Sequence, residues 1–176
     1  MMTQVSKLLL TGLPACGKTT TIIRLAELLK GRSIAGFYTE EVLSAGQRIG
    51  FQIKTFSGSQ GLLGSLQTKS PYWVGRYGVD VRGFEQLVLP ELEPAGRRVD
   101  VFLIDEIGKM ECFSAHFIQA VQGLLEGPVP VVATVALKGK GFVEDVKALD
   151  SVKILHVTAQ NREALPDQIL QRLALE

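Results

Sequence analysis

The segment Gly12 to Thr19 carries the residues whose types and spacing point most directly to chemistry. It reads Gly-Leu-Pro-Ala-Cys-Gly-Lys-Thr and fits the pattern GxxxxGK[ST] of loops that bind phosphate groups. In such a loop, backbone N–H groups and the N-terminus of the next helix surround the phosphate. Lys18 is expected to bridge the β- and γ-phosphates of a nucleotide, and the Thr19 hydroxyl to ligate Mg²⁺.

The flanking sequence supplies the strand and the helix that such a loop requires. An apolar run precedes it at residues 7–11, and a helix-compatible stretch follows at residues 19–30. We therefore predict a nucleotide phosphate site instead of a glycine-rich turn that binds nothing. Gly12 and Gly17 are required because a Cβ would strain the loop or block the phosphate. The residues assigned to nucleotide binding here are Gly12, Leu13, Pro14, Ala15, Cys16, Gly17, Lys18, Thr19 and Thr20.

A second apolar run, which ends in two acids, supplies the other half of the expected site. Residues 101–106 read Val-Phe-Leu-Ile-Asp-Glu, the form of a Walker B strand. Such a strand would bring Asp105 to the carboxyl edge of the sheet, beside the phosphate loop. We expect Asp105 to hold Mg²⁺, usually through a water molecule. Glu106 is expected to orient and deprotonate an attacking water as a general base, so the predicted catalytic residues are Glu106 and Lys18.

The segment after the acids argues against strict selection of guanine. Residues 105–108 satisfy the DxxG pattern of signalling GTPases, but these also need an Asn/Thr-Lys-x-Asp segment after a later strand. The strand that ends near Val135 is followed by Ala-Leu-Lys-Gly-Lys, without such an acid. Thr134, on that strand, has two interpretations: a contact to the attacking water or γ-phosphate, or a threonine half-buried in a strand.

Charge that develops at the γ-phosphate calls for a further cation. The sequence does not choose among the candidates, which are Lys109, Lys138, Lys140, Arg76 and Arg82.

Trp73 and Tyr77 are suited either to stacking on a base or to core packing. His116 and His156 have no carboxylate or cysteine partner at metal-binding or catalytic spacing, so we interpret both as structural.

Short apolar runs alternate with helical patterns along the chain, which is typical of a parallel sheet covered on both faces. The predicted strands are residues 7–11, 33–40, 48–55, 99–105, 129–135 and 152–157. The second and third flank Ser-Ala-Gly-Gln and predict a β-hairpin. Residues 57–80 are rich in glycine and serine and are expected to form a loop region with one short strand near residues 72–74.

Helices are predicted after residue 19, from residue 81, over residues 113–125 and 142–149, and after Asn161. Ser114 and Asn161 are expected to cap the third and the last of these. Pro90 is expected to kink or shorten the second. The fold class is therefore α/β: a three-layer P-loop NTPase-type fold with an inserted β-hairpin, formed by residues 1–176 as a single domain.

Composition and charge exclude several classes of protein. The chain has 176 residues, 46% of them hydrophobic and 21% charged, which excludes global disorder. A net charge of +1 with no basic block longer than Arg97-Arg98 gives no indication of nucleic-acid binding. The longest apolar stretch, residues 129–137, is far shorter than the ~20 residues of a membrane span. Two cysteines and an early first strand, which leaves no room for a signal peptide, indicate a cytoplasmic protein.

Together these motifs resemble a small P-loop nucleoside-triphosphatase family found in bacteria, archaea and animals, the family of the human cancer-related nucleoside-triphosphatase. The resemblance extends over nearly the whole chain. Its segments are residues 12–20, 36–42 with 48–51, 74–79, 105–111 and 158–166. The phosphate loop is shared by many families, whereas the block Asp-Glu-Ile-Gly-Lys-Met-Glu at residues 105–111 is far more specific.

This resemblance implies a RecA-like, mostly parallel sheet with strand order 5-1-4-3-2. It also implies Mg²⁺-dependent hydrolysis of several nucleoside triphosphates (ATP, GTP, CTP and UTP) to diphosphate and phosphate, with broad base tolerance. By its position, Arg162 would belong to the base-binding rim; a surface arginine beside a helix cap is the alternative. Ala15 departs from the family, which more often has glycine after the proline, and we expect nucleotide binding to survive this change.

The leading functional hypothesis is therefore a nucleoside-triphosphate phosphohydrolase. One alternative is a nucleotide or small-molecule kinase, in which Glu106 would activate a substrate hydroxyl and the hairpin would close over the site. A second alternative is a nucleotide-dependent binding switch with negligible turnover. The sequence assigns neither an oligomeric state nor a physiological substrate.

Overall fold

The fold is that of a computed structural model, described here for residues 6–173 and 175. Its strands are β1 (Lys7–Thr11), β2 (Ile34–Ser44), β3 (Gln47–Thr55), β4 (Gln60–Ser65), β5 (Trp73–Val74), β6 (Tyr77–Val79), β7 (Val101–Ile107), β8 (Val131–Val135) and β9 (Lys153–His156). Its α-helices are α1 (Lys18–Leu28), α2 (Val81–Leu92), α3 (Ala115–Glu126), α4 (Phe142–Lys147) and α5 (Leu165–Arg172). A 3₁₀ turn, η1 (Glu111–Phe113), precedes α3.

The strands form one sheet in the order β5-β6-β4-β3-β2-β7-β8-β1-β9. From β2 to β9 every neighbouring pair is parallel. Numbered along the chain as five strands, this part has the order 5-1-4-3-2 from β9 to β2. The order implied by the resemblance and the α/β fold class are therefore both confirmed.

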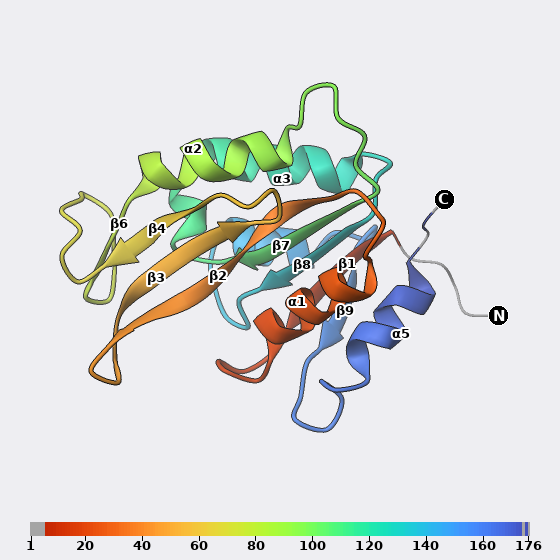
Figure 1. The fold of residues 1–176 in the computed structure, drawn as a ribbon, viewed down its shortest axis with the longest axis horizontal. Coiled ribbons are helices and arrows are strands. Elements are labelled where there is room, and N and C mark those ends of the chain that lie inside the picture. Colours follow the sequence, from red (N-terminus) through yellow and green to blue (C-terminus); the bar gives the residue numbers. More distant parts are fainter. Residues whose placement is uncertain (1–5, 174, 176) are drawn as a thin grey trace.

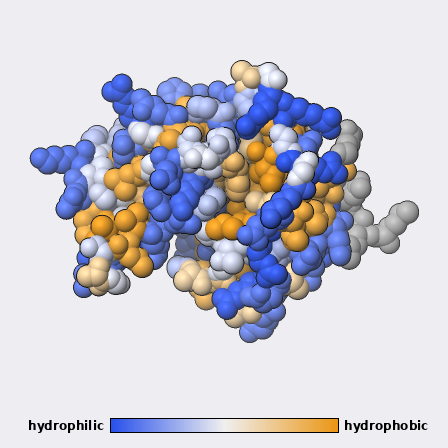
Figure 2. Space-filling model, viewed as in Figure 1, coloured by the Kyte–Doolittle hydropathy of each residue, from blue (hydrophilic) through white to orange (hydrophobic). Residues whose placement is uncertain are grey.

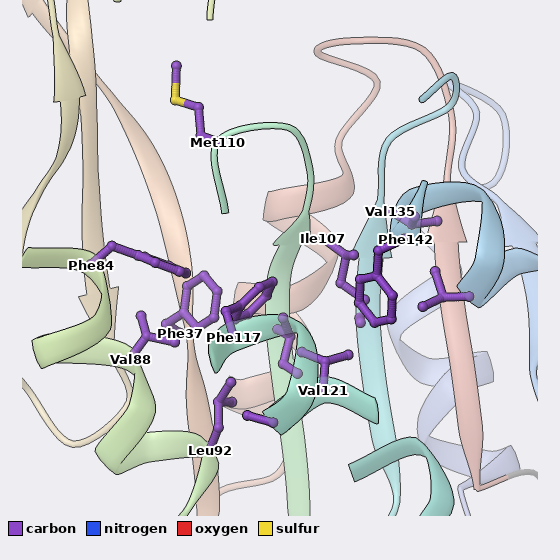
Figure 3. Packing of buried hydrophobic residues seen from close by; sticks show 14 of the residues in the cluster. Phe37, Phe84, Val88, Leu92, Ile107, Met110, Phe117, Val121, Val135 and Phe142 are labelled. Atoms are coloured by element: carbon purple, nitrogen blue, oxygen red, sulfur yellow. The ribbon is translucent and has the colours of Figure 1, made fainter. Parts of the chain in front are cut away.

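Helices cover the parallel part on both faces, with α2 and α3 on one side and α1 and α5 on the other (Figure 1). Because side chains alternate along a strand, each buried strand serves both layers. Phe102 and Ile104 join the cluster under α2 and α3, whereas Val101 and Leu103 join the cluster under α1 and α5. In the first cluster Phe37, Phe84 and Phe117 pack against one another edge to face, with ring centroids 5.2 to 6.0 Å apart (Figure 3). The result is the predicted three-layer arrangement.

The hairpin of β2 and β3 extends the sheet in antiparallel sense, as predicted. Ala45 and Gly46 make its two-residue turn, with φ angles of 49° and 75°, the positive values that tight hairpin turns need. The expectation for residues 57–80 was incomplete: the short strand near residue 73 exists, but β4 and β6 also add to the sheet. Figure 1 shows these edge strands beyond the hairpin.

The helix boundaries show where the sequence patterns were and were not sufficient. Ser114 caps α3 as predicted, since its Oγ accepts a hydrogen bond from the N–H of Phe117 at 3.0 Å. Helix α2 continues two residues beyond Pro90 before it ends. Asn161 does not cap α5: its side chain holds the turn before that helix, and α5 begins only at Leu165 with a proline in its first turn.

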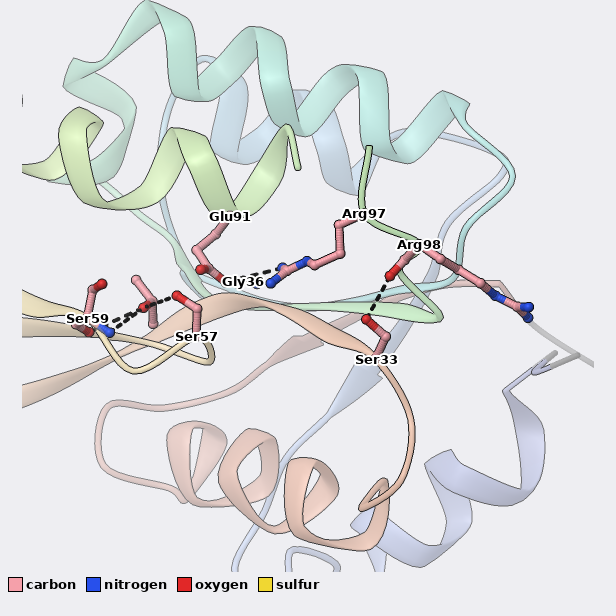
Figure 4. A network of polar contacts seen from close by, with 8 residues as sticks. Ser33, Gly36, Ser57, Ser59, Glu91, Arg97 and Arg98 are labelled. Atoms are coloured by element: carbon pink, nitrogen blue, oxygen red, sulfur yellow. Dashed lines mark hydrogen bonds and ion pairs between the residues drawn. The ribbon is translucent and has the colours of Figure 1, made fainter. Parts of the chain in front are cut away.

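A buried carboxylate ties helix α2 to strand β2. Glu91 is 5% exposed and accepts a hydrogen bond from the N–H of Gly36 at 3.1 Å, while Arg97 lies 3.9 Å from the same carboxylate (Figure 4). A side chain at Gly36 is sterically excluded, because a Cβ there would lie 1.9 Å from the carbonyl oxygen of Leu103.

None of the helices in the described part of the chain has the length and apolar character needed to span a bilayer.

Candidate active site

The phosphate loop connects β1 to α1, and close contacts leave little room for a side chain at two of its glycines. A Cβ on Gly12 would lie 2.6 Å from the carbonyl oxygen of Val157, and one on Gly17 would lie 3.1 Å from Cδ of Arg162. Gly17 also has a φ of 109°, in the region that favours glycine. Ala15, where the resembling family more often has glycine, has a φ of 58°. The alanine therefore occupies a left-handed backbone conformation that favours glycine.

Lys18 starts helix α1 and reaches back over the loop. Its ammonium donates hydrogen bonds to the carbonyl oxygens of Gly12 at 3.0 Å and Leu13 at 3.1 Å. Because α1 begins at this residue, the partial positive charge of the helix N-terminus points at the same place. Lys18 and the start of α1 therefore give the loop a positive interior suited to phosphate.

Asp105 is the centre of the polar network next to the loop. It is 2% exposed, and its Oδ2 accepts a hydrogen bond from the Thr19 hydroxyl at 2.7 Å. Its Oδ1 accepts one from Thr134 at 2.6 Å, and Thr39 adds a backbone N–H at 3.3 Å. Burial raises the pKa of Asp105, and these hydrogen bonds lower it again in part. Of the two interpretations of Thr134, the structure favours a threonine within the strand, which is fully buried instead of half-buried and donates its hydroxyl to Asp105.

Glu106 follows Asp105 where the pairing of β7 with β8 shifts register, between Ile104 and Ile107. The bond between the two acids is a cis peptide. Burial and the neighbouring Asp105 raise the pKa of Glu106, while Lys18 acts against this. Glu106 is thus a partly buried carboxyl group within electrostatic reach of the lysine of the phosphate loop.

A cavity of about 380 Å³ brings these predicted residues together. It is lined by Pro14, Ala15, Gly17, Lys18, Thr19, Thr20, Thr39, Glu40, Glu41, Phe51, Asp105 and Glu106. Figure 2 shows the surface hollowed between the part that carries the hairpin and the part that carries α1. The hairpin residues Thr39, Glu40, Glu41 and Phe51 were not predicted here. Their only signal in the sequence was that they fall within residues 36–42 and 48–51, two of the segments that carry the family resemblance.

A neighbouring cavity of about 560 Å³ lies on the other side of the phosphate loop. Arg162 lines it together with Leu13, Leu137 and His156, and the Arg162 side chain is 46% exposed. The turn that presents Arg162 is held by Asn161, whose side chain accepts the N–H of Thr158 and donates to the carbonyl of His156. This position agrees with a place on the rim beside the phosphate loop. His156, which we interpreted as structural, also lines this cavity.

The remaining candidates are distributed elsewhere. Lys109, Lys138 and Lys140 line a third cavity that shares no residue with the first. Arg76 and Arg82 are exposed and line none of the three. Tyr77 is buried against Phe51 at a ring distance of 5.2 Å, whereas Trp73 is 49% exposed and is not a core residue. His116 is exposed and bonds Glu85 at 3.1 Å, which agrees with a structural role.

The chain matches a protein-family model described as NTPase over residues 7–170. It belongs to this NTPase family. It is 41% identical to a nucleoside-triphosphatase THEP1 of Thermotoga sp. (strain RQ2), over 95% of both chains. It is 46% identical to the human cancer-related nucleoside-triphosphatase, over 90% of this chain and 92% of that protein.

Solved structures agree with the membership in the NTPase family. The crystal structure of THEP1 from the hyperthermophile Aquifex aeolicus superposes with a TM-score of 0.86 at 38% identity, covering 96% of this chain and 99% of that one. The solution structure of the human cancer-related protein gives 0.82 at 42% identity, covering 95% and 96%. The suspected family and the P-loop fold are thereby confirmed.

Proposed function

We propose that this protein is a nucleoside-triphosphate phosphohydrolase that releases the γ-phosphate of a nucleoside triphosphate. One observation carries the proposal: the Thr19 hydroxyl lies 2.7 Å from Asp105, and both line one cavity with Lys18 and Glu106. Two segments far apart in the sequence thus form one phosphate site. The relatives are named nucleoside-triphosphatases, which supports the same activity.

The residues present fit Mg²⁺ as the cofactor. Thr19 and Asp105 offer hard oxygen atoms at hydrogen-bonding distance from each other, the type of ligand that Mg²⁺ prefers. No group of three or more His, Cys, Asp or Glu suited to a metal lies within residues 6–173 and 175. This agrees with an ion held by one hydroxyl, one carboxylate, water and substrate phosphate. When bound, Mg²⁺ would neutralise charge on the β- and γ-phosphates.

In the proposed mechanism the loop amides and Lys18 bind the β- and γ-phosphates. A water bonds to the γ-phosphorus while the bond from that phosphorus to the β–γ bridging oxygen breaks. Glu106 orients the water and accepts its proton, and the products are a nucleoside diphosphate and phosphate. Lys18 stabilises the charge that develops on the transferred group. Thr134 and Thr39 act through Asp105, whose carboxylate they orient.

The cavity next to the phosphate loop is the proposed place of the base. Arg162, at its rim, would stack on the base or donate hydrogen bonds to it. A flat guanidinium face accepts any base, which supports broad tolerance among ATP, GTP, CTP and UTP. The single domain of residues 1–176, the cytoplasmic location and the absence of a nucleic-acid partner stay predictions.

The test is phosphate release from ATP, GTP, CTP and UTP with Mg²⁺, comparing wild type, Glu106→Gln and Lys18→Ala. We expect release from several triphosphates, and a loss of about 10²-fold or more in Glu106→Gln while nucleotide still binds. Lys30→Ala, a change of an exposed lysine outside all the cavities described above, is the matched control and should keep wild-type turnover. Full activity of Lys18→Ala would overturn the proposal.

A further inference from the structure

The third cavity, with a volume of about 640 Å³, has no part in the proposed hydrolysis. It is lined by Trp73, Val74, Gly75, Lys109, Cys112, Phe113, Lys138, Gly139, Lys140 and Val143. These residues come from β5 and the turn after it, from the segment after β7, and from the segment between β8 and the first turn of α4. A volume of this size lies within the range of roughly 300–1,000 Å³ that is typical of small-molecule sites.

The charge on this cavity is positive and unbalanced. Within the described part of the chain, Lys109, Lys138 and Lys140 take part in no ion pair or hydrogen bond, and no acid is among the lining residues. Three acids lie close to these lysines along the chain, and none of them lines the cavity. Glu106 lines the first cavity and Glu111 is buried. The Oε1 of Glu144 accepts hydrogen bonds from the N–H of Gly139 and from Lys147, both at 3.0 Å. Three lysines that line one cavity, with no acid among its lining residues, favour an anionic ligand.

Aromatic rings form another part of the wall. Trp73 is 49% exposed, and its indole N–H donates to the carbonyl of Ser70 at 2.6 Å, which fixes the ring although it faces solvent. Phe113 is 36% exposed and is braced by Tyr72, with ring centroids 5.1 Å apart. Large exposed aromatic rings that are held in place are suited to stacking against a flat ligand.

We propose that this cavity binds a small ligand that combines a phosphate-type anionic group with a planar ring, in the size class of a nucleoside monophosphate. The lysines would bind the anionic group, and Trp73 would stack on the ring. This is a second site on the molecule, because none of its lining residues belongs to the phosphate-loop cavities. It adjoins the first site through the chain, since Lys109 lies three residues after Glu106.

Trp73 is the only tryptophan in the sequence, so its fluorescence reports on this cavity. The experiment titrates AMP into the protein and follows Trp73 emission, with adenosine and inorganic phosphate as separate probes of the ring and the charge. It is run on wild type, on Lys18→Ala, on the double variant Lys138→Ala/Lys140→Ala and on the control Lys30→Ala/Lys153→Ala. Both pairs change two exposed lysines, but only the first pair lines the cavity.

We expect saturable quenching by AMP that persists in Lys18→Ala, weaker binding of adenosine, and competition by phosphate. The Lys138/Lys140 double variant should bind AMP about tenfold more weakly, and the control pair should bind as wild type does. Trp73→Leu, followed by equilibrium dialysis with labelled AMP, should show a similar loss. Quenching that disappears in Lys18→Ala, that does not saturate, or that both lysine pairs weaken equally would overturn the proposal.

Discussion

At the scale of single residues, Asp105 decides how the site is built. A carboxylate that is 2% exposed is costly to bury unless hydrogen-bond donors surround it. Here three threonines from three different elements supply them: Thr19 from α1, Thr39 from β2 and Thr134 from β8. The phosphate loop, the hairpin and the central strands are therefore all fixed in position at one side chain.

Two buried threonines on the neighbouring strands β8 and β1 test whether hydrogen bonds to Asp105 stabilise the fold, because their replacement by valine should change stability in opposite directions. Thr134→Val removes the donor to Asp105, so we expect unfolding free energy to fall by about 1–3 kcal/mol and turnover to fall with it. The hydroxyl of Thr11 is buried without a hydrogen-bond partner in the described part of the chain. Thr11→Val should therefore keep or raise stability, by up to about 1 kcal/mol. Denaturant unfolding measures the stability of the two variants, and phosphate release measures their turnover. Equal destabilisation by the two changes would contradict a stabilising role for the hydrogen bond from Thr134 to Asp105.

The left-handed residue in the phosphate loop gives a second prediction. Ala15 adopts a φ of 58°, which costs an alanine roughly 1 kcal/mol relative to glycine. Ala15→Gly should therefore stabilise the folded protein by about 0.5–1 kcal/mol, measured as a higher denaturation midpoint. Ala159→Gly, at an exposed position outside that conformation, is the control and should give no gain. A loss of stability in Ala15→Gly would contradict this prediction. It would show that the lower conformational entropy that alanine gives the unfolded chain outweighs its strain in the loop.

At the scale of elements, Lys7 connects strand β1 to the segment between α3 and β8. Its ammonium is buried and donates to the carbonyls of Leu124 and Val129, and burial lowers its pKa from 10.5 to about 8. Above pH 8 the folded protein loses this proton, whereas the unfolded chain keeps it until about pH 10.5. The unfolded state then binds more protons, so this group makes stability rise with pH across that window.

The corresponding measurement is unfolding free energy at several pH values between 7 and 10.5. Relative to Lys7→Met, the wild type should gain on the order of 3 kcal/mol over this window. The control Lys153→Met, at the exposed start of β9, should keep the wild-type slope. Parallel pH curves for wild type and Lys7→Met would show that the pKa of Lys7 is not lowered.

The elements also show what the sequence could and could not predict. Apolar runs such as residues 8–10 and 101–104 predict buried strands directly, because every residue in them lies in one of the two cores. Strands β4 and β6 escaped prediction because close backbone contacts, not side-chain alternation, select their residues. A Cβ on Gly64 would lie 2.6 Å from the carbonyl of Gly78, and one on Gly78 would lie 2.0 Å from that of Thr68. Glycines selected in this way look like a loop in the sequence.

At the scale of the whole molecule, the site joins segments that lie far apart in the chain. The phosphate loop and the two acids could be predicted because each has a local pattern with a chemical reason. Thr39 and Phe51 could not, since only the pairing of β2 with β7 and with β3 brings them to the loop. Likewise, the three lysines that the sequence offered as γ-phosphate cations share a cavity only because the turns after β7 and β8 fold side by side.

A site assembled from distant segments exists only in the folded protein, so its ligand should stabilise the whole fold. Nucleoside diphosphate with Mg²⁺ at about 100 times its dissociation constant should add about 2.7 kcal/mol to the unfolding free energy. In thermal unfolding this is a higher midpoint that rises further with ligand concentration. Lys18→Ala should lose the shift, whereas Lys30→Ala, in the turn after α1 and outside the phosphate loop, should keep it. An equal shift in both variants would mean that the diphosphate stabilises the protein from some other site.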